Sequence, residues 1–364
     1  MTTSPFTVDV TPDRQGLIDC IKRKKTPQRV HFIELFLDDE VEAAVATTFG
    51  LADQLDPNDK FFAQKRHLAV QRFLGYDYVH CSVTDFEFPL KYLAAEDTAD
   101  LRRRGGRQFI EEHDGPITNW QEFEAYPWPN PNAACLDAMR WYQENLPDDM
   151  CIIAWPCFGH LAELLSWLMG YETLCYALYD QRDLVRAISD RVIEISQVTL
   201  RQLLAFDRVE LVWASDDMGF RSGTLISPAD LREFVLPGHK LLAQMAHETH
   251  RPYLLHACGK LDDIMEDLID DVGIDGKHSF EDTIEDVCDV KQSYGDRIAL
   301  LGGIDVDFLC RADQQQIRTR VRDTLQKCMP GGGFCLGTGN TVANYIPLDN
   351  YLVMLDEGRR FDPS

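Results

Sequence analysis

Eight apolar, strand-like segments alternate with helical patterns along the chain, which predicts an α/β fold and, from their number and order, a (β/α)8 barrel, the TIM barrel. Several of these segments are almost continuously apolar, as is typical of parallel strands that helices cover on both faces. The 364 residues contain neither an internal repeat nor a Pro- or Ser-rich linker. We therefore expect residues 1–364 to form one domain.

The strands are expected at apolar runs that end in turn-forming residues. In chain order they span residues 29–36, 77–83, 150–155, 208–214, 252–257, 273–278, 298–302 and 332–336. The first, third, fourth and fifth of these are the near-continuous apolar runs, so they are the clearest candidates for buried parallel strands.

The helices between the strands are marked by apolar spacing and by signals at their ends. Apolar residues at i, i+3 and i+4 predict helices over 261–272 and 317–328. Gly273 supplies a stop for the first, and Pro330 stops the second. Ser227, followed by a proline, is typical of an N-cap and predicts a helix start after the fourth strand.

The connection after the second strand is long, spanning residues 84–149. It contains a predicted hairpin that turns at Gly105 and Gly106, followed by an aromatic, Pro-rich stretch over 120–131. We interpret this connection as an elaboration over one edge of the barrel mouth. Its basic residues at 102–107 would lie at the hairpin tip, in solvent or against an acidic partner.

Composition argues against several classes of function. The chain has 36 Lys and Arg against 60 Asp and Glu, a formal charge of −24, which would repel phosphates and anionic lipids and so disfavours binding to nucleic acid or a membrane surface. It has no run of eighteen apolar residues and no apolar core of a signal peptide. Its eleven cysteines include no Cys-x-x-Cys pair, which predicts a reducing, cytoplasmic location rather than a disulfide framework.

A candidate metal site lies where barrel enzymes carry their chemistry, at the carboxyl ends of the strands. His256 and Cys258 close the fifth predicted strand, and because they are two residues apart their side chains leave from the same face. Cys335 ends the eighth strand, across the same mouth. One histidine and two cysteines suit Zn²⁺ and leave one position open for catalysis, although all three could instead be buried core residues.

Several motifs together resemble the uroporphyrinogen decarboxylase superfamily. They are the HACG sequence at 256–259, Cys335, the Ser-Pro helix start at 227–228 and GTGNTVANYIP at 337–347. The resemblance extends from about Arg29 to Gly358. The His-x-Cys…Cys set resembles in particular the zinc methyltransferase branch, whose members move a methyl group between a corrinoid protein and a thiol such as coenzyme M.

The resemblance implies a cofactor, partners and residue roles. Zn²⁺ would be held by His256, Cys258 and Cys335, with Glu281 as a candidate fourth ligand that an incoming thiol displaces. The corrinoid (methylcobalamin) would be carried by a partner protein, since no cobalamin-binding domain fits in this chain. A small-molecule methyl donor or acceptor would be the second partner, and a homo-oligomer is compatible with the sequence.

One stretch departs from the decarboxylases of this superfamily. Those enzymes carry an Arg-rich N-terminal motif for the carboxylates of a porphyrinogen, whereas VHFIELF at 30–36 is followed here by Asp38, Asp39 and Glu40. An anionic tetrapyrrole would be repelled there, which disfavours decarboxylation. A decarboxylase and a non-catalytic barrel that binds a corrinoid or tetrapyrrole remain the alternative hypotheses.

Further candidates lie at the other strand ends. Asp216 and Asp217, candidate catalytic residues, follow the fourth strand and would orient His256, bind a polar substrate group or cap the start of a helix. Glu34 could instead form a buried ion pair with an arginine, and His278 could be a hydrogen-bonded core histidine. The residues expected to bind substrate are Glu34, Trp155, Phe158, His160, His278, Asp305 and Asn340.

Overall fold

A computed structural model describes residues 4–103, 106–155 and 158–363, and it confirms the predicted α/β class. Seven parallel strands form one sheet in the order β1-β4-β5-β8-β9-β10-β11, so neighbours in the sheet follow one another along the chain, as in a TIM barrel. The strands are β1 (Tyr78–Cys81), β4 (Cys151–Ala154), β5 (Val209–Ser215), β8 (Tyr253–His256), β9 (Gly276–His278), β10 (Ala299–Leu301) and β11 (Phe334–Cys335).

The first predicted strand, residues 29–36, differs from the expectation. It runs beside β11 but pairs only through isolated parallel bridges, Phe32 with Leu336 and Leu37 with Val342. On its other side, the Glu34 amide donates to the hydroxyl of Tyr78 at 2.9 Å. A side chain of β1 therefore takes the place of a backbone carbonyl, and at this position no ladder to β1 forms.

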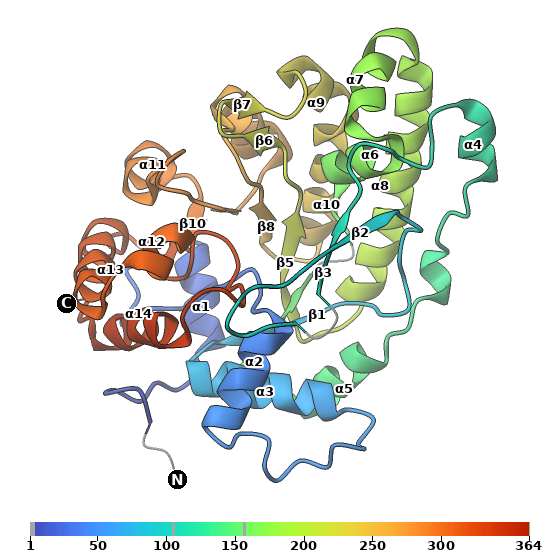
Figure 1. Ribbon diagram of the computed structural model, residues 1–364. Helices are drawn as coiled ribbons and strands as arrows, with labels where there is room; N and C mark the ends of the chain where they lie inside the picture. The colour runs from blue at the N-terminus through green and yellow to red at the C-terminus, as the bar shows by residue number, and fades with distance from the viewer. Residues whose placement is uncertain (1–3, 104–105, 156–157, 364) are drawn as a thin grey trace.

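Helices lie outside the strands and cover them (Figure 1). Strands β4 and β8 are buried at every position, as expected for strands covered on both faces. The helices are α1 (Arg14–Ile21), α2 (Asp39–Thr48), α3 (Phe62–Leu74), α6 (Leu161–Met169), α7 (Tyr171–Asp180), α8 (Arg182–Leu204), α9 (Pro228–Phe234), α10 (Leu236–Glu248), α11 (Val287–Tyr294), α12 (Val306–Arg311), α13 (Gln314–Cys328) and α14 (Leu348–Arg360).

The predicted helix ends can be compared directly. Ser227 caps α9 by accepting from the Asp230 amide at 3.1 Å, and the segment 317–328 lies within α13, so both predictions are confirmed. The segment 261–272 forms a 3-10 turn, η2 (Asp262–Ile264), and then a π-helical turn, η3 (Asp267–Val272), rather than one α-helix. The apolar spacing predicted helical curvature there, but the chain winds more loosely before Gly273 ends it at a φ of 82°.

The connection 84–149 contains the predicted hairpin, because β2 (Tyr92–Ala95) and β3 (Arg107–Ile110) pair antiparallel. Of the predicted turn residues, Gly105 lies outside the described ranges. The rest of the connection forms α4 (Trp120–Ala125), the 3-10 turn η1 (Pro131–Ala133) and α5 (Asp137–Asn145).

The hairpin is held to the first turn of α2. Arg107 pairs with Asp38 at 3.1 Å and Arg103 with Glu40 at 2.9 Å, so these hairpin cations neutralise carboxylates of the same chain. These ion pairs also offset part of the negative charge of residues 38–40. Across the described ranges, no helix has both the length and the apolar character needed to pass through a bilayer.

Candidate metal and active site

Three neighbouring strand ends bring the main candidate residues together. The β5–β8 register pairs Ser215 with His256, and the β8–β9 register pairs His256 with His278. Asp217 and Cys258 each lie two residues beyond the paired Ser215 and His256, so they emerge at the same level of the mouth. The predicted placement of these residues at the carboxyl end of the sheet is confirmed by this register.

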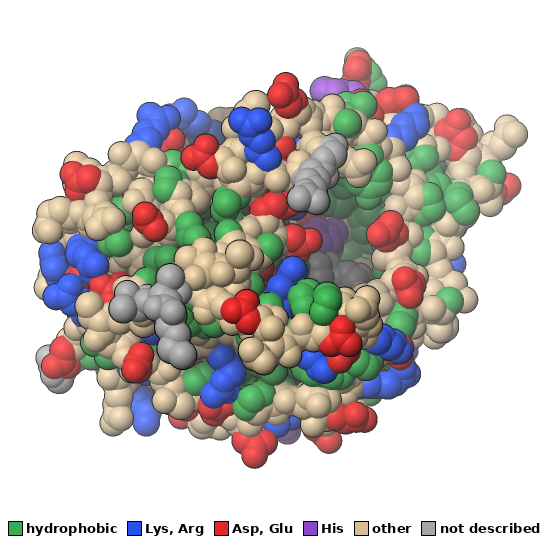
Figure 2. Space-filling view, turned by 60° about the horizontal axis from the view of Figure 1, so that its bottom comes forward, with side chains coloured by type: hydrophobic (Ala, Val, Ile, Leu, Met, Phe, Trp, Pro, Cys, Tyr) green, Lys and Arg blue, Asp and Glu red, His purple; other side chains and the backbone are tan. Residues whose placement is uncertain are grey.

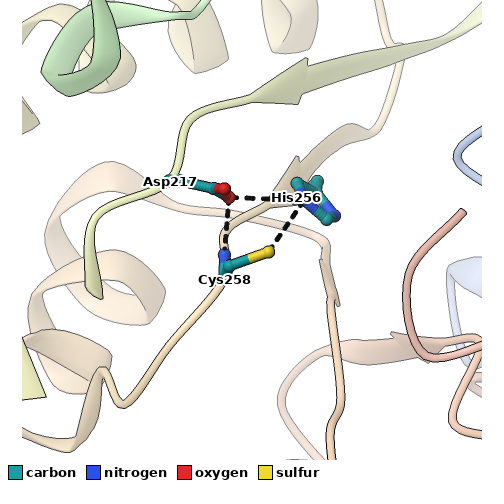
Figure 3. Close-up of side chains that lie close together, drawn as sticks. All are labelled: Asp217, His256 and Cys258. Carbon is teal, nitrogen blue, oxygen red and sulfur yellow. Dashed lines mark hydrogen bonds and ion pairs between the residues drawn. The ribbon is translucent and has the colours of Figure 1, made fainter. Parts of the chain in front are cut away.

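Asp217, His256 and Cys258 form a compact cluster (Figure 3). His256 Nε2 lies 3.4 Å from Cys258 Sγ and 3.4 Å from Asp217 Oδ1. The Cys258 amide donates to Asp217 Oδ1 at 2.8 Å, which fixes the carboxylate against the loop that carries the cysteine. One nitrogen, one sulfur and one oxygen ligand atom thus lie within 4.8 Å of one another.

The hydrogen bonds behind the cluster determine which nitrogen of His256 faces it. His278 Nε2 lies 3.2 Å from the carbonyl oxygen of Thr338, which only accepts, so this nitrogen carries a proton. Burial, and secondarily the neighbouring His256, lower the pKa of His278 well below its usual value, so its ring is neutral and its Nδ1 accepts. His256 Nδ1, at 2.7 Å, must then donate, and in the neutral His256 ring the lone pair is on Nε2, toward Cys258 and Asp217.

The electrostatics of the cluster favour a bound cation. Burial would raise the pKa of Asp217, but the neighbouring His256 and the hydrogen bond from the Cys258 amide outweigh it and lower this pKa to about 2, so the carboxylate is ionised. Burial, followed by the Asp217 charge, raises the pKa of the Cys258 thiol. Cys258 therefore needs a cation nearby to become a thiolate at neutral pH.

Two of the three ligand-atom spacings in the cluster, both measured from His256 Nε2, fit Zn²⁺. Tetrahedral zinc with bonds of about 2.0–2.3 Å places neighbouring ligand atoms about 3.3–3.7 Å apart. Both distances from His256 Nε2 are 3.4 Å, within that range. The donor set, one imidazole, one thiol and one carboxylate, is also one that zinc accepts, and three protein ligands leave a position open for a reactant.

Polar side chains lie beside the cluster, on the side that faces a neighbouring cleft. Asn340 Nδ2 donates to Cys258 Sγ at 3.4 Å, and Ser279 Oγ lies 3.8 Å from the same sulfur. Burial, followed by the charges of Asp305 and Asp217, raises the pKa of Glu281. The cleft has a volume of about 550 Å³, and Glu281, Asp305 and Asn340 line it.

The hollowed surface of the molecule is visible in the space-filling view. Figure 2 shows a depression with acidic side chains around its opening and a histidine side chain within it.

Asp305 lines the cleft but also has a structural role, since it accepts from the amides of Phe308 at 2.8 Å and Asp282 at 3.0 Å and so caps α12.

Cys335, the third predicted ligand, does not join the cluster among the described residues. It lies on β11, fully buried, with its thiol hydrogen-bonded to Cys20 of α1. Side chains alternate between the two faces of a strand, and Cys335 takes the face that packs on the outer helix. Three residues later Thr338 reaches the interior instead, where its amide donates to Glu34 Oε1 at 2.9 Å.

Asp216 also differs from the prediction of a catalytic role. Its carboxylate accepts from the amides of Ala162 at 2.9 Å and Glu163 at 3.0 Å, in the first turn of α6, and from His239 Nε2 at 2.8 Å. Asp216 is completely buried, and its side chain faces the helices, whereas that of its neighbour Asp217 faces the cluster. The helix-capping alternative is the one that the geometry supports.

The other residues predicted to bind substrate line two further cavities. Glu34 and Trp155 line a cavity of about 300 Å³, and Glu34 bonds to Thr338 rather than to an arginine. Phe158 and His160 line a separate cavity of about 350 Å³ beside the β2–β3 hairpin. His160 Nδ1 also lies 2.7 Å from Glu163, so it contacts α6 and not the cluster.

Sequence reasoning missed three residues of this region: Thr338, Ser279 and His80. Thr338 is part of the GTGN motif, and Ser279 directly follows His278, so their positions in the chain were available signals. His80 lies on β1, and its ring centroid is 5.7 Å from that of Trp213, which in turn is 5.5 Å from His278. Only the curvature of the sheet, which the sequence does not give, brings β1 close to β9.

Comparisons with known proteins agree with this architecture. A sequence model of the family described as uroporphyrinogen decarboxylase (URO-D) matches residues 112–361. A solved structure of a methyltransferase from Methanosarcina mazei superposes with a TM-score of 0.71 at 17% identity, covering 96% of this chain and 99% of that one, which shows a shared fold.

Three curated relatives match over 130 residues each. The methylated-thiol–coenzyme M methyltransferase of Methanosarcina mazei is 34% identical over 35% of this chain and 32% of its own length. The methylcobamide:CoM methyltransferase MtaA of Methanosarcina barkeri is 31% identical (35% and 36%), and the uroporphyrinogen decarboxylase of Gloeobacter violaceus is 28% identical (34% and 35%). The matches thus span about a third of each relative. Because the family match covers more than half of the sequence, the chain belongs to the uroporphyrinogen decarboxylase (URO-D) family.

Proposed function

We propose that this protein is a zinc-dependent methyltransferase that moves a methyl group between a corrinoid carried by a partner protein and a small acceptor or donor such as a thiol. The observation that carries the proposal is the Asp217, His256 and Cys258 cluster at the mouth of the barrel. Two relatives whose names specify coenzyme M methyltransferases support the reaction class.

The proposed ligand set is His256, Cys258 and Asp217, with Asp217 in the place first expected for Cys335. Zn²⁺ bound there would lower the pKa of a coordinated thiol, so that a thiolate is present at neutral pH. His278 and the Thr338 carbonyl hold the His256 ring in the tautomer with Nε2 free. Asn340 restrains the Cys258 sulfur through its amide hydrogen.

Glu281 is the proposed fourth ligand and the proton acceptor. It is partly buried, and its raised pKa makes it a better base than an exposed carboxylate. As an incoming thiol takes its position, the Glu281 carboxylate would accept the proton that leaves the thiol sulfur. The thiolate would then attack the methyl carbon of the partner's methylcorrinoid in line, forming the S–C bond as the Co–C bond breaks and its electron pair stays with the corrinoid, while the protein contributes position and orientation.

A transfer assay tests the proposal and separates it from the decarboxylase alternative. Zinc-loaded protein is incubated anaerobically with methylcobalamin and a panel of thiols, and loss of the methylcobalamin absorbance is followed. We expect thiol-dependent demethylation by the wild type and its loss in Cys258→Ala. Conversion of uroporphyrinogen by both proteins, with no demethylation by either, would reject the methyltransferase and support a decarboxylase.

The expected location and assembly remain part of the proposal. The ten cysteines within the described ranges are free thiols, which supports a reducing compartment such as the cytoplasm. No contact between chains is needed to complete the cluster, because all three ligand residues come from one chain. A homo-oligomer is therefore compatible with the site but not required by it.

A further inference from the structure

The cleft beside the metal cluster carries more negative than positive charge. Its volume is about 550 Å³, and it adjoins the cluster because Asn340 both lines it and donates to Cys258 Sγ at 3.4 Å. A reactant held at the cluster therefore extends into this cleft. Among the described residues that line it are four carboxylates and one arginine: Glu281, Asp282, Asp305, Asp307 and Arg311.

The cations in and around the cleft are already paired with carboxylates of the same chain. Arg311 is the cation that lines it, and three others lie over the rings of Phe280, Phe308 and Tyr345, which also line it. These four cations therefore offer little free positive charge to an anionic group of a ligand. The ion pairs are Arg311 with Asp307 (2.8 Å), Arg320 with Asp282 (2.6 Å), Lys277 with Glu285 (3.0 Å) and Arg107 with Asp38 (3.1 Å).

The carboxylates of Glu281 and Asp305 lack such a cation, since neither forms an ion pair within the described part of the chain. Asp305 accepts from the amides of Phe308 at 2.8 Å and Asp282 at 3.0 Å. Because amides are neutral, these bonds orient the carboxylate without cancelling its charge. Only 8% of Asp305 is exposed, so water screens this charge less than it would at an open surface.

A bound metal ion does not supply the missing positive charge. In the proposed ligand set, Asp217 and the Cys258 thiolate balance the two charges of Zn²⁺. An incoming thiolate adds a negative charge, while Glu281 becomes neutral as it takes the thiol proton. The charge of Asp305 remains beside the reactant. A positively charged tail on the thiol would gain a counter-charge there, whereas a negatively charged tail would be repelled.

We propose that the cleft selects the reacting thiol by charge: it accepts a short aminothiol, whose ammonium group lies toward Asp305, and discriminates against thiols with a sulfonate tail. The inference rests on the proposed function and names the class of thiol that this site takes. It also separates the chain from two of its relatives, whose names specify coenzyme M, because coenzyme M is 2-mercaptoethanesulfonate.

The first experiment measures thiol binding without a corrinoid. Co²⁺ replaces Zn²⁺, because it takes the same kinds of ligand, and the sulfur-to-cobalt absorbance reports the bound thiolate. The probes share a two-carbon stem: 2-aminoethanethiol, 2-mercaptoethanol and 2-mercaptoethanesulfonate. We expect 2-aminoethanethiol to bind about tenfold or more tightly than the sulfonate at low salt, with the neutral thiol between them. Added salt should narrow the difference. Equal or tighter binding of the sulfonate would overturn the proposal.

The second experiment assigns the selection to Asp305. The thiols also differ in intrinsic acidity, but the ratio of two affinities, compared between variants, cancels that difference. Asp305→Asn keeps a good helix-capping residue and removes the charge, so it should lower the preference for 2-aminoethanethiol over the sulfonate about fivefold. An unchanged preference in Asp305→Asn would overturn the role of Asp305.

Asp13→Asn is the matched control. Asp13 is an exposed N-cap that accepts from the Gly16 amide at 2.9 Å, and its own amide donates to Asp77, directly before β1, at the opposite end of the sheet from the cleft. This variant should keep the wild-type preference, and an equal loss in both variants would overturn the assignment to Asp305. Absence of the sulfur-to-cobalt absorbance with all three thiols would reject thiol binding at the metal, and with it the proposed function. A band that is strongest with the sulfonate would reject the charge selection alone.

Discussion

His256 and His278 face each other through their Nδ1 atoms, 2.7 Å apart, on adjacent parallel strands. The second nitrogen of His278 donates to the carbonyl of Thr338 at 3.2 Å. A backbone carbonyl therefore determines, through two imidazole rings, that His256 presents Nε2 to Asp217 and Cys258. His278 is in this account a positioning residue for the metal ligand rather than a substrate contact.

Replacing His278 with Phe removes the acceptor for His256 Nδ1–H. The affinity for zinc should fall about 10–100-fold, the usual effect of losing such a partner of a ligand histidine. His278→Asn, whose side-chain oxygen can accept from His256, should recover part of the affinity. Competition with a chelator measures the affinity, and ¹⁵N NMR of the metal-free protein reports the His256 tautomer. Unchanged affinity and tautomer in His278→Phe would contradict the assigned role.

Asp216 and Asp217 form a matched pair of neighbouring carboxylates with different roles. Asp216→Asn replaces an acceptor of two helix amides and of His239, so it should lower the free energy of unfolding by about 1–3 kcal/mol. Asp217→Asn, toward the cluster, should change stability less but lose zinc. Urea unfolding and zinc content of both variants test this division, and the opposite assignment of effects would refute it.

Glu34 predicts a pH dependence of stability. Burial raises the pKa of Glu34 to about 8 in the folded protein, above the ordinary value of 4.5. The folded state thus holds a proton that the unfolded state has lost, and this contribution is full below about pH 4.5 and disappears as the pH rises through about 8. The unfolding free energy of the wild type should fall relative to that of Glu34→Gln by a few kcal/mol (order of magnitude) over this range.

Urea titrations at several pH values between 5 and 9 provide the measurement. Glutamine keeps the shape of the side chain, and its amide can still bond to the amide and hydroxyl of Thr338. Parallel stability curves for the wild type and Glu34→Gln would show that Glu34 ionises normally in the folded protein.

Much of the fold was predictable because it rests on local patterns. The buried strands β4, β5 and β8 appear in the sequence as apolar runs, and His256 and Cys258 are paired by their spacing on one strand. The first predicted strand was less regular than expected, because the Tyr78 hydroxyl rather than the backbone of β1 accepts from Glu34. The spacing of apolar residues does not reveal that a side chain has replaced a backbone group as a hydrogen-bond partner.

The third member of the cluster, the proposed metal ligand Asp217, could not be predicted from residue type and strand position alone. Cys335 and Asp217 both lie near strand ends, and cysteine is the more usual partner for a zinc-bound His-x-Cys pair. The choice depends on which face of β11 the Cys335 side chain occupies, and that is set by packing against Cys20 on α1. Tertiary packing, not the local sequence, places Cys335 away from the cluster.

We propose that Asp217 and not Cys335 completes the set with His256 and Cys258. The direct test is zinc per chain, by elemental analysis of protein purified anaerobically and loaded with zinc, for the wild type, Cys258→Ala, Asp217→Asn and Cys335→Ala. We expect about one zinc per chain in the wild type and in Cys335→Ala, and little in Cys258→Ala and Asp217→Asn. Two results would contradict this ligand set. One is loss of zinc from Cys335→Ala together with its retention by Asp217→Asn, and the other is absence of zinc from the folded wild-type protein.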